Sequence, residues 1–288
     1  MNVEIGLNIL AFITLIEMMI YVGLSVSTND IWDTIRDWTL LARGILANYV
    51  LFPAVTICLL LFFRPPTLVA VGFMILAVCP AGPYGAPYTA IAKGNVGTAA
   101  GLMIILASMS PILSPVLLHL LVPLVSGAGP FTIDVSKLVV TLLLGQVLPL
   151  LAGLSVHRLR PQLAAKLLRP AGLCAKILNV VFLLLVVYVQ FDSFLAIRWP
   201  GFVGMLLLLV ASVSIGWMMG GPGRERRKAM ALTTSVRNNG VALVVATGVY
   251  PGTSVVTVAV VYGLVGVLGG LGFALWWNRQ ASRRQAVE

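Results

Sequence analysis

Charged residues are scarce in this chain. Asp, Glu, Lys and Arg together make up 10% of the sequence, whereas 59% of the residues are hydrophobic and the mean hydropathy is +1.02. A soluble globular domain carries about 25% charged residues. The shortage excludes a fold whose whole surface faces water, and it indicates a protein that lies in a lipid bilayer.

Cysteine and histidine are rare as well. The cysteines, Cys58, Cys79 and Cys174, are dispersed in apolar segments, and neither His119 nor His157 has a metal-ligating neighbour in sequence. An odd, dispersed set of cysteines argues against a disulfide framework and against a zinc site. Paired carboxylates near a polar segment and a glycine-rich phosphate loop are also missing. We therefore expect no enzyme, no cofactor and no metal centre.

Long apolar runs fill most of the chain, and a bilayer core needs about 20 such residues per helix. The first run has no basic residues before it and is too long for a cleavable signal, so we expect it to be retained. The predicted fold class is an all-α polytopic membrane protein. We predict nine transmembrane helices, at residues 4–26, 39–63, 67–91, 95–124, 131–156, 171–191, 199–220, 228–249 and 253–277.

Basic residues gather in the gaps on one side of these spans. Apart from the loop Ser27–Asp37, twelve Lys and Arg fall on the side of the C-terminus and three on the side of the N-terminus. Cytoplasmic loops carry such an excess of basic residues. We predict a multi-pass protein of the cell (inner) membrane, with its N-terminus outside and an irregular cytoplasmic tail at 278–288. The net charge of +10 then reflects topology, and nucleic acid is not expected as a partner.

Two of the apolar runs are broken by residues that a buried helix should not contain. Backbone that is unwound at mid-membrane must be buried in protein or face a wet cavity, and interrupted helices at matching places indicate a transporter's binding site. The glycines at 82 and 85 would let the two breaks approach closely. The breaks are Cys79-Pro80-Ala81-Gly82-Pro83-Tyr84-Gly85-Ala86-Pro87-Tyr88 and Thr233-Thr234-Ser235-Val236-Arg237-Asn238-Asn239-Gly240.

The order of the spans indicates an inverted repeat. Spans 1 to 4 can be matched with spans 6 to 9, and the two units begin on opposite sides of the membrane. Each unit has its break in the third of its four spans. Inverted repeats with broken helices recur in secondary transporters. Direct sequence similarity between the halves is weak, so this prediction rests on the pattern.

Arg237 is the most informative residue of the second break. A charged residue near the centre of a membrane helix costs about 2.5–3.5 kcal/mol even on insertion scales, so it should face protein or water. With Thr233, Ser235, Asn238 and Asn239 around it, and with helix ends that add backbone donors, it would recognise an anion such as a carboxylate. The alternative is a structural ion pair that locks two helices together, and the sequence leaves both open.

Four further residues are candidates for the site. Tyr84 and Tyr88 flank the first break, and Asn48 is a lone amide in the second span. Each would either line a substrate cavity or simply pack and hydrogen-bond between helices. Glu17, in the middle of the first span, is the candidate coupling residue. It would carry a proton, pair with Arg237 or bond a polar neighbour.

The order and spacing of several motifs resemble the bile acid:sodium symporter family, in the form of a bacterial homologue with nine helices. The resemblance implies a fold whose first of ten helices is missing here. It also implies a panel domain (1–26 and 131–191) and a core domain (39–124 and 199–277), with substrate bound between them near the crossing of the broken helices. The motifs are Met19-Ile20-Tyr21-Val22-Gly23-Leu24, Leu46-Ala47-Asn48-Tyr49-Val50-Leu51-Phe52-Pro53-Ala54, Cys79-Pro80-Ala81-Gly82, Ala92-Lys93-Gly94-Asn95-Val96, Ser114-Pro115 and Arg237-Asn238-Asn239-Gly240-Val241-Ala242.

The chain departs from that family where the resemblance places the sodium ligands. Only Asn48 keeps an amide. The carboxylate and glutamine of the family's second break are replaced, and Arg237 adds a guanidinium. We therefore expect Arg237 to supply in place the positive charge that bound sodium supplies elsewhere. The altered positions are Pro83, Tyr84, Gly85 and Ala86, then Ala99 and Met103, and Thr233 to Arg237.

These patterns predict a secondary transporter that moves a small organic anion, a carboxylate or an amphipathic acid, by alternating access and without sodium. Protons are a candidate coupling ion. One alternative is a conventional sodium symporter with rearranged ion sites, and another is a non-transporting membrane receptor with the same fold. A channel is disfavoured because broken helices in an inverted repeat suit alternating access. The sequence leaves the oligomeric state open.

Overall fold

The computed structural model describes residues 3–126, 134–192 and 199–285, and no strand occurs among them. The chain is all-helical there, as its apolar runs predict. The elements are α1 (Val3–Ser25), α2 (Thr28–Arg36), α3 (Trp38–Leu46), η1 (Ala47–Leu51), α4 (Phe52–Phe63), α5 (Thr67–Val78), α6 (Gly85–Ile91), α7 (Val96–Ser126), α8 (Val135–Leu142), η2 (Leu143–Val147), α9 (Leu148–Leu159), α10 (Pro161–Val189), α12 (Trp199–Met219), α13 (Arg224–Ser235), α14 (Asn239–Val249) and α15 (Ser254–Gln285).

Seven helical stretches of the described residues are long and apolar enough to cross a membrane. They correspond to the seven predicted spans without a break. The third and eighth predicted spans, which we expected to be broken, are each a pair of shorter helices, α5 with α6 and α13 with α14. The protein is an all-helical polytopic membrane protein.

Three segments that we expected outside the spans are helical. The loop at 27–37 contains α2, which begins after Ser27 because the Oγ of that serine accepts a hydrogen bond from the amide of Asn29 at 3.2 Å. Helix α10 begins at Pro161 rather than at residue 171, and proline suits the first turn of a helix. Helix α15 continues to Gln285, so most of the predicted tail is regular helix rather than irregular chain.

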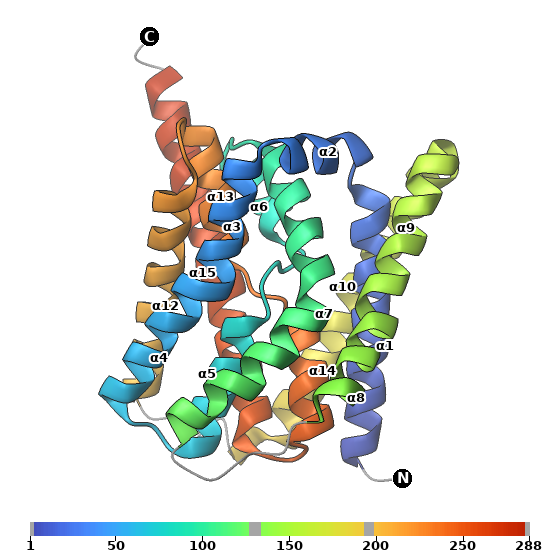
Figure 1. Cartoon of the computed structure of the whole chain (residues 1–288). Coiled ribbons are helices and arrows are strands. Elements are labelled where there is room, and N and C mark those ends of the chain that lie inside the picture. Colours follow the sequence, from blue (N-terminus) through green and yellow to red (C-terminus); the bar gives the residue numbers. More distant parts are fainter. Residues whose placement is uncertain (1–2, 127–133, 193–198, 286–288) are drawn as a thin grey trace.

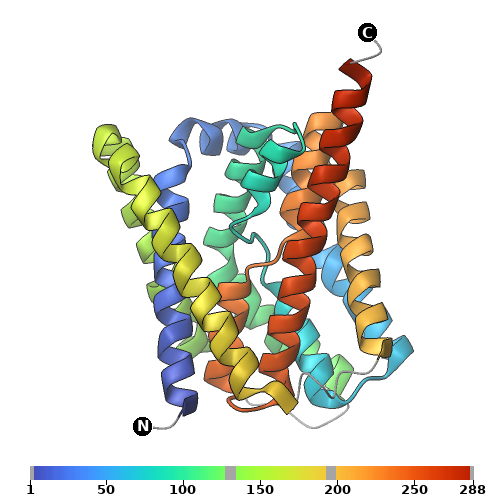
Figure 2. The ribbon, with the colours of Figure 1, turned by 180° about the vertical axis from the view of Figure 1, so that it is seen from behind.

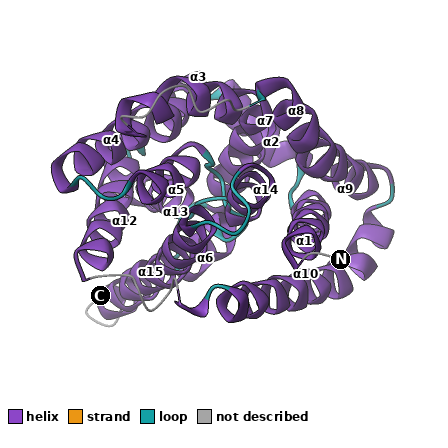
Figure 3. Cartoon of the chain, turned by 90° about the horizontal axis from the view of Figure 1, so that it is seen from below, coloured by secondary structure: helices purple, strands orange, loops and turns teal. Residues whose placement is uncertain are grey.

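Helices α1, α9 and α10 pack together at one side of the molecule (Figures 1 and 3). Glycines bring the backbones of α1 and α9 into contact: a Cβ on Gly23 would lie 2.4 Å from the carbonyl oxygen of Leu150. In its most apolar stretch, α10 has only 22% of its residues buried inside the protein, compared with 61% for α7. Helix α10 therefore borders lipid, whereas α7 lies in the interior.

The two ends of the chain lie at opposite ends of the helices. Helix α1 begins at the lower end in Figure 1 and α15 ends at the upper end, where α2 lies across the tops of the spans. Below, we call the end where α1 begins the α1-start face. Seen along the helices, α5, α13 and α14 lie inside the ring that the other helices form (Figure 3).

Proline shapes the buried helix α7. The helix continues through Pro111, Pro115 and Pro123, but Pro111 has no N–H for the carbonyl of Ala107, four residues earlier. That carbonyl accepts a hydrogen bond of 2.7 Å from the Nε2 of Gln146, a buried residue of η2. The proline thus provides the acceptor that a buried amide side chain needs.

Candidate functional site

The two breaks meet inside the molecule. The first runs from Cys79 to Tyr84, between α5 and α6, and the second from Val236 to Asn238, between α13 and α14, so both are narrower than predicted. Two backbone hydrogen bonds join them, from the amide of Gly82 to the carbonyl of Val236 (3.0 Å) and from the amide of Asn238 to the carbonyl of Cys79 (2.9 Å). The unwound segments therefore satisfy each other's polar groups where the interior offers no water.

Glycine is required where the breaks touch. A Cβ on Gly82 would lie 2.3 Å from the carbonyl oxygen of Arg237, closer than any real contact. A Cβ on Gly85, at the start of α6, would lie 3.2 Å from the Cα of Thr233. The close approach that we expected of these two glycines is confirmed.

Arg237 lies in the second break and is buried, with 3% of its surface exposed. Its Nη1 donates a hydrogen bond of 3.1 Å to the Oδ1 of Asn48. Its Cζ lies 3.8 Å from the centre of the Phe52 ring, which is cation–π geometry. Arg237 forms no ion pair with any described residue. The ion pair that the described residues do form, between Arg226 and Asp37, lies elsewhere in the molecule. The structural ion pair that we considered for Arg237 is therefore not formed within the described ranges.

Asn48 connects the second span to the broken helices. It lies in η1, a widened helical turn just before Pro53. Its Nδ2 donates to the carbonyl of Gly44 at 2.9 Å and to the Oγ1 of Thr234 at 3.3 Å, while its Oδ1 accepts from Arg237. All the polar atoms of this amide are thus engaged, and they fix the position of the guanidinium.

Buried polar atoms without a hydrogen-bond partner concentrate at the second break. They are the Oγ1 of Thr233, the Nε and Nη2 of Arg237, the Nδ2 of Asn238 and the Oδ1 of Asn239. Leaving such a group unpaired costs about 1–3 kcal/mol. Buried polar groups in native structures are nearly always paired, so this concentration is typical of a functional site rather than of a packed core.

The remaining candidates of the second break are satisfied locally. The Oγ of Ser235 donates to the carbonyl of Leu232 at 3.1 Å, within α13. The Oδ1 of Asn238 accepts from the amide of Val241 at 3.2 Å and so caps the start of α14. The hydroxyl of Ser235 and the side-chain oxygen of Asn238 therefore stabilise the backbone conformation of the break.

Tyr84 and Tyr88 stack on each other, with ring centres 5.8 Å apart. The hydroxyl of Tyr84 accepts a hydrogen bond of 3.3 Å from the Nδ2 of Asn179 on α10. Tyr88 packs in an apolar cluster that includes Trp277. The first of the two tyrosines therefore reaches the α1–α9–α10 group, and the second packs on α15.

Glu17 is not brought to Arg237. It is half-buried on α1 and has no hydrogen bond or ion pair with any described residue. Leu15 of the same helix lies against Gly240 at the start of α14. Residues two apart point about 200° apart around a helix, so Glu17 faces away from α14. The pairing of Glu17 with Arg237 that we considered is not formed.

The positions to which the resemblance assigns sodium ligands do not form an oxygen cage. Ala99 and Met103 are buried and apolar, and the Oδ1 of Asn48 already accepts a hydrogen bond from Arg237. Sodium, like other hard cations, requires several oxygen ligands. Of the side chains at these positions, Thr233 offers a buried oxygen without a hydrogen-bond partner, so they supply fewer oxygen ligands than the resemblance implies for the family.

The roles of three residues of the site escaped prediction. Phe52 gave no signal, because an aromatic residue in an apolar span predicts packing. Thr234 was recognised as one of the polar residues around Arg237, but its contact with Asn48 was not predicted. Asn179 offered a usable signal, since it is a lone amide in an apolar run, like Asn48.

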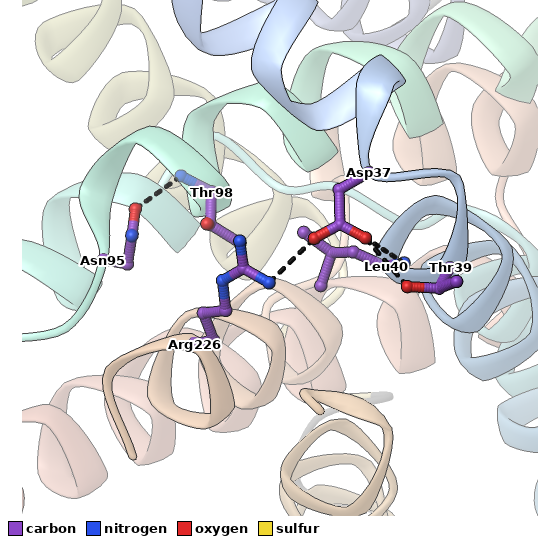
Figure 4. A network of polar contacts seen from close by, with 6 residues as sticks. All are labelled: Asp37, Thr39, Leu40, Asn95, Thr98 and Arg226. Carbon is purple, nitrogen blue, oxygen red and sulfur yellow. Dashed lines mark hydrogen bonds and ion pairs between the residues drawn. The ribbon is translucent and has the colours of Figure 1, made fainter. Parts of the chain in front are cut away.

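A second polar network lies at the opposite end from the α1-start face, between α2 and α3 (Figure 4). The Nη1 of Arg226 on α13 lies 2.7 Å from the Oδ2 of Asp37, whose Oδ1 accepts from the Oγ1 of Thr39 (2.8 Å) and the amide of Leu40 (3.1 Å). These hydrogen bonds, that from Thr39 first, hold the pKa of Asp37 below its ordinary value. The network ties the connection between the first two spans to α13.

Comparison with known proteins agrees with the resemblance seen in the sequence. The "Uncharacterized sodium-dependent transporter YocS" of Bacillus subtilis (strain 168) is 24% identical over 278 residues, which cover 93% of this chain and 83% of the relative. The "Probable sodium/metabolite cotransporter BASS2, chloroplastic" of Oryza sativa subsp. japonica is 21% identical over 267 residues. That match covers 91% of this chain and 62% of the rice protein, so the chain spans less than two thirds of that relative.

The chain also matches the sequence model of a whole family. The sequence model of the SBF-like CPA transporter family matches residues 7–265. This confirms the resemblance to bile acid:sodium symporters and the expectation that the protein is not an enzyme. Since the match covers most of its length, the chain belongs to the SBF-like CPA transporter family.

Proposed function

We propose that this protein is a secondary transporter that moves a small organic anion by alternating access and that does not use sodium. The substrate is a carboxylate or a larger amphipathic acid. The single observation that carries the proposal is the buried guanidinium of Arg237, which lies where the breaks cross and which has a neutral amide rather than a carboxylate as its hydrogen-bond partner.

The energetics of this charge support anion recognition. A buried ion without a counter-charge costs several kcal/mol. The contact with Phe52 recovers about 2 kcal/mol if it is desolvated, and the hydrogen bond to Asn48 recovers part of the rest. The Nε and Nη2 of Arg237 and the Nδ2 of Asn238 remain as donors without an acceptor. An anion that approaches the crossing would offset the remaining cost.

The arrangement of the helices supports transport between two domains. In our proposal α1, α8, α9 and α10 form the panel domain, and the helices around the crossing form the core domain, related internally by an inverted repeat. The substrate would lie between the domains near Tyr84 and the start of α14. The N-terminus would face the outside of the cell membrane and the C-terminus the cytoplasm.

Sodium-coupled symport is the second candidate, and the printed names of the two relatives favour it. The hydrogen bond from the guanidinium of Arg237 to the Oδ1 of Asn48 argues against it, because that oxygen is then not free to bind sodium. Coupling to protons through Glu17 is a variant of the main proposal, because Glu17 is the one carboxylate that we place at mid-span on α1.

Transport in proteoliposomes tests the proposal. A panel of organic acids is first screened by thermal shift of the purified protein at two pH values, and the stabilising acids are then used as substrates. We expect saturable uptake and counterflow that persist when sodium is replaced by potassium or choline. A strong sodium requirement would overturn the proposal in favour of symport, and flux without saturation or counterflow would indicate a channel.

A further inference from the structure

Helix α10 has one narrow stripe of buried residues, and two polar side chains lie in it. Its buried apolar members from residue 172 onward are Gly172, Ala175, Phe182 and Val186. When Asn179 and Gln190 are included, successive members are three or four residues apart. They are eleven residues, or about three helical turns, apart, and Gln190 directly follows the last residue of α10, so both lie on about the same side of the helix axis. Polar side chains in a lipid-bordering helix need partners, and these two have them.

The partner of Asn179 lies in the first break, and the partner of Gln190 lies on α15. The Nδ2 of Asn179 donates to the hydroxyl of Tyr84, in the first break, at 3.3 Å. The Oε1 of Gln190 accepts a hydrogen bond from the Oγ1 of Thr257, in the first turn of α15. Gln190 and Thr257 are 7% and 1% exposed, so this hydrogen bond is shielded from water. Helix α10 is thus joined to the proposed core domain at mid-membrane and near the α1-start face.

The α1-start face is also where the two proposed domains converge. Figure 2 shows the C-terminal end of α10 beside the start of α15, and the other end of α10 far from α15. Helix α1 packs on α14 in the same half, with Leu15 against Gly240 and Asn8 beside Gly248.

A cavity of about 270 Å³ opens next to Gln190 on the seam between the proposed domains. Leu7, Val189, Gln190 and Asp192 line it from the α1 and α10 side. Thr247, Pro251, Gly252 and Val256 line it from the α14 and α15 side.

We infer that Gln190 and Thr257, assisted by Asn179 and Tyr84, form a latch that holds the transporter closed at the α1-start face. The cavity is the vestibule outside the latch. For the substrate path to open to this face, α10 must separate from α15, so the hydrogen bond between Gln190 and Thr257 must break. The pair thereby sets the balance between the closed and open states of this face. The inference rests on the proposed alternating access, but its test uses no substrate, so it fails independently of the proposed anion.

Labelling of a buried cysteine tests the latch. Val244, 3% exposed, lies on α14 between Gly240 and Gly248 and on the same face, behind the latch. Val244→Cys is made in a chain whose Cys58, Cys79 and Cys174 are alanine. Its reaction rate with a membrane-impermeant thiol reagent reports opening. A second reporter, Asp134→Cys, is exposed at the α1-start face and shows whether intact cells or inverted vesicles present that face to the reagent.

We expect Thr257→Val and Gln190→Leu each to raise the labelling rate about three- to tenfold, which is the effect of losing one hydrogen bond. Tyr84→Phe, which removes only the bond to Asn179, should change the rate in the same direction. The double variant should label no faster than either single variant of the pair, because both remove the same interaction. Thr257→Ser keeps the hydroxyl and should restore the original rate.

Thr56→Val is the matched control. Thr56 is equally buried, but its hydroxyl donates to the carbonyl of Phe52 in its own helix at 2.9 Å. A Thr257→Val rate equal to that of this control would overturn the latch, and so would a double variant whose increase is the product of the two single increases. If Thr257→Val does not fold, Gln190→Leu against the same control gives the answer.

Discussion

The Nη1 of Arg237 donates to the Oδ1 of Asn48 across 3.1 Å, at the point where the two unwound segments cross. A buried arginine normally pairs with a carboxylate. Here its partner is neutral, so the positive charge is held in place without being cancelled. This relationship is the basis of the proposed preference for an anion over sodium, and it can be tested by changing either residue.

Arg237→Gln removes the charge and keeps a shorter side chain that can still form hydrogen bonds. We expect the variant to fold and to lose more than tenfold in affinity for the anion, because losing a charged hydrogen bond costs about 1.5–3 kcal/mol. Binding is measured by thermal shift and uptake, and folding by size-exclusion chromatography. Arg279→Gln, an exposed arginine of α15, should change neither. Collapse of the folding yield in Arg237→Gln, with unchanged affinity in the protein that folds, would assign Arg237 a purely structural role.

Asn48→Asp supplies the carboxylate that Arg237 lacks. The change adds a counter-charge at hydrogen-bond distance from Arg237, but it removes the donor to the carbonyl of Gly44, so we expect the thermal midpoint to change little. Anion binding should nevertheless be lost, since the guanidinium is neutralised. Asn48→Leu is the companion variant, and it should lower stability by about 1–3 kcal/mol because Arg237 loses its acceptor. Full anion uptake by Asn48→Asp would contradict the role of the free charge.

The contact between the breaks predicts a sharp difference between two glycines. In Gly82→Ala the new methyl group would lie 2.3 Å from the carbonyl oxygen of Arg237, so the crossing must separate. We expect a loss of more than about 2 kcal/mol in the free energy of unfolding, in the range of severe overpacking. Gly272→Ala in α15 meets nothing within 4 Å and should be neutral or slightly stabilising. Thermal unfolding in detergent measures both, and equal midpoints would contradict the close crossing.

Local chemistry made most of the fold predictable. Long apolar runs without charged residues in their middle indicated most of the seven continuous spans, because each run must satisfy its own backbone in lipid. The two breaks were predictable for the converse reason: Pro80-Ala81-Gly82-Pro83 and Val236-Arg237-Asn238 cannot continue an apolar helix at no cost. The helix between the first two spans was missed because it is short and has a low overall hydropathy, although Ile31, Trp32 and Ile35 recur at helical spacing and Ser27 caps its start.

Contacts between distant residues could not be predicted in the same way. That the two breaks meet followed from their matching places, but the identity of the partners of Arg237 did not. Asn48 is 189 positions away, and only the folded chain places Phe52 one turn further along the same helix. Asn179 and Gln190 show the same limit, since an amide in an apolar run indicates that a partner exists without naming it.

The ion pair between Arg226 and Asp37 predicts a pH dependence at the opposite end of the molecule. The bonds from Thr39, Leu40 and Arg226 favour the ionised carboxylate and lower the pKa of Asp37 from its ordinary value of 3.8. A group whose pKa is lower in the folded state adds stability above the unfolded-state pKa and loses it as the pH falls through the folded-state pKa. Both side chains are partly exposed, at 41% and 25%, so the contribution of the ion pair to stability is about 0.2–1 kcal/mol.

We expect Asp37→Asn to unfold at a lower temperature than the original chain from pH 8 to pH 5. The difference between the two unfolding temperatures should close as the pH falls below about 4. Asp33→Asn, on the same helix α2 and without a side-chain hydrogen bond to any described residue, serves as the control. A gap that is as large at pH 3 as at pH 7 would show that the carboxylate at position 37 acts through packing and not through its charge.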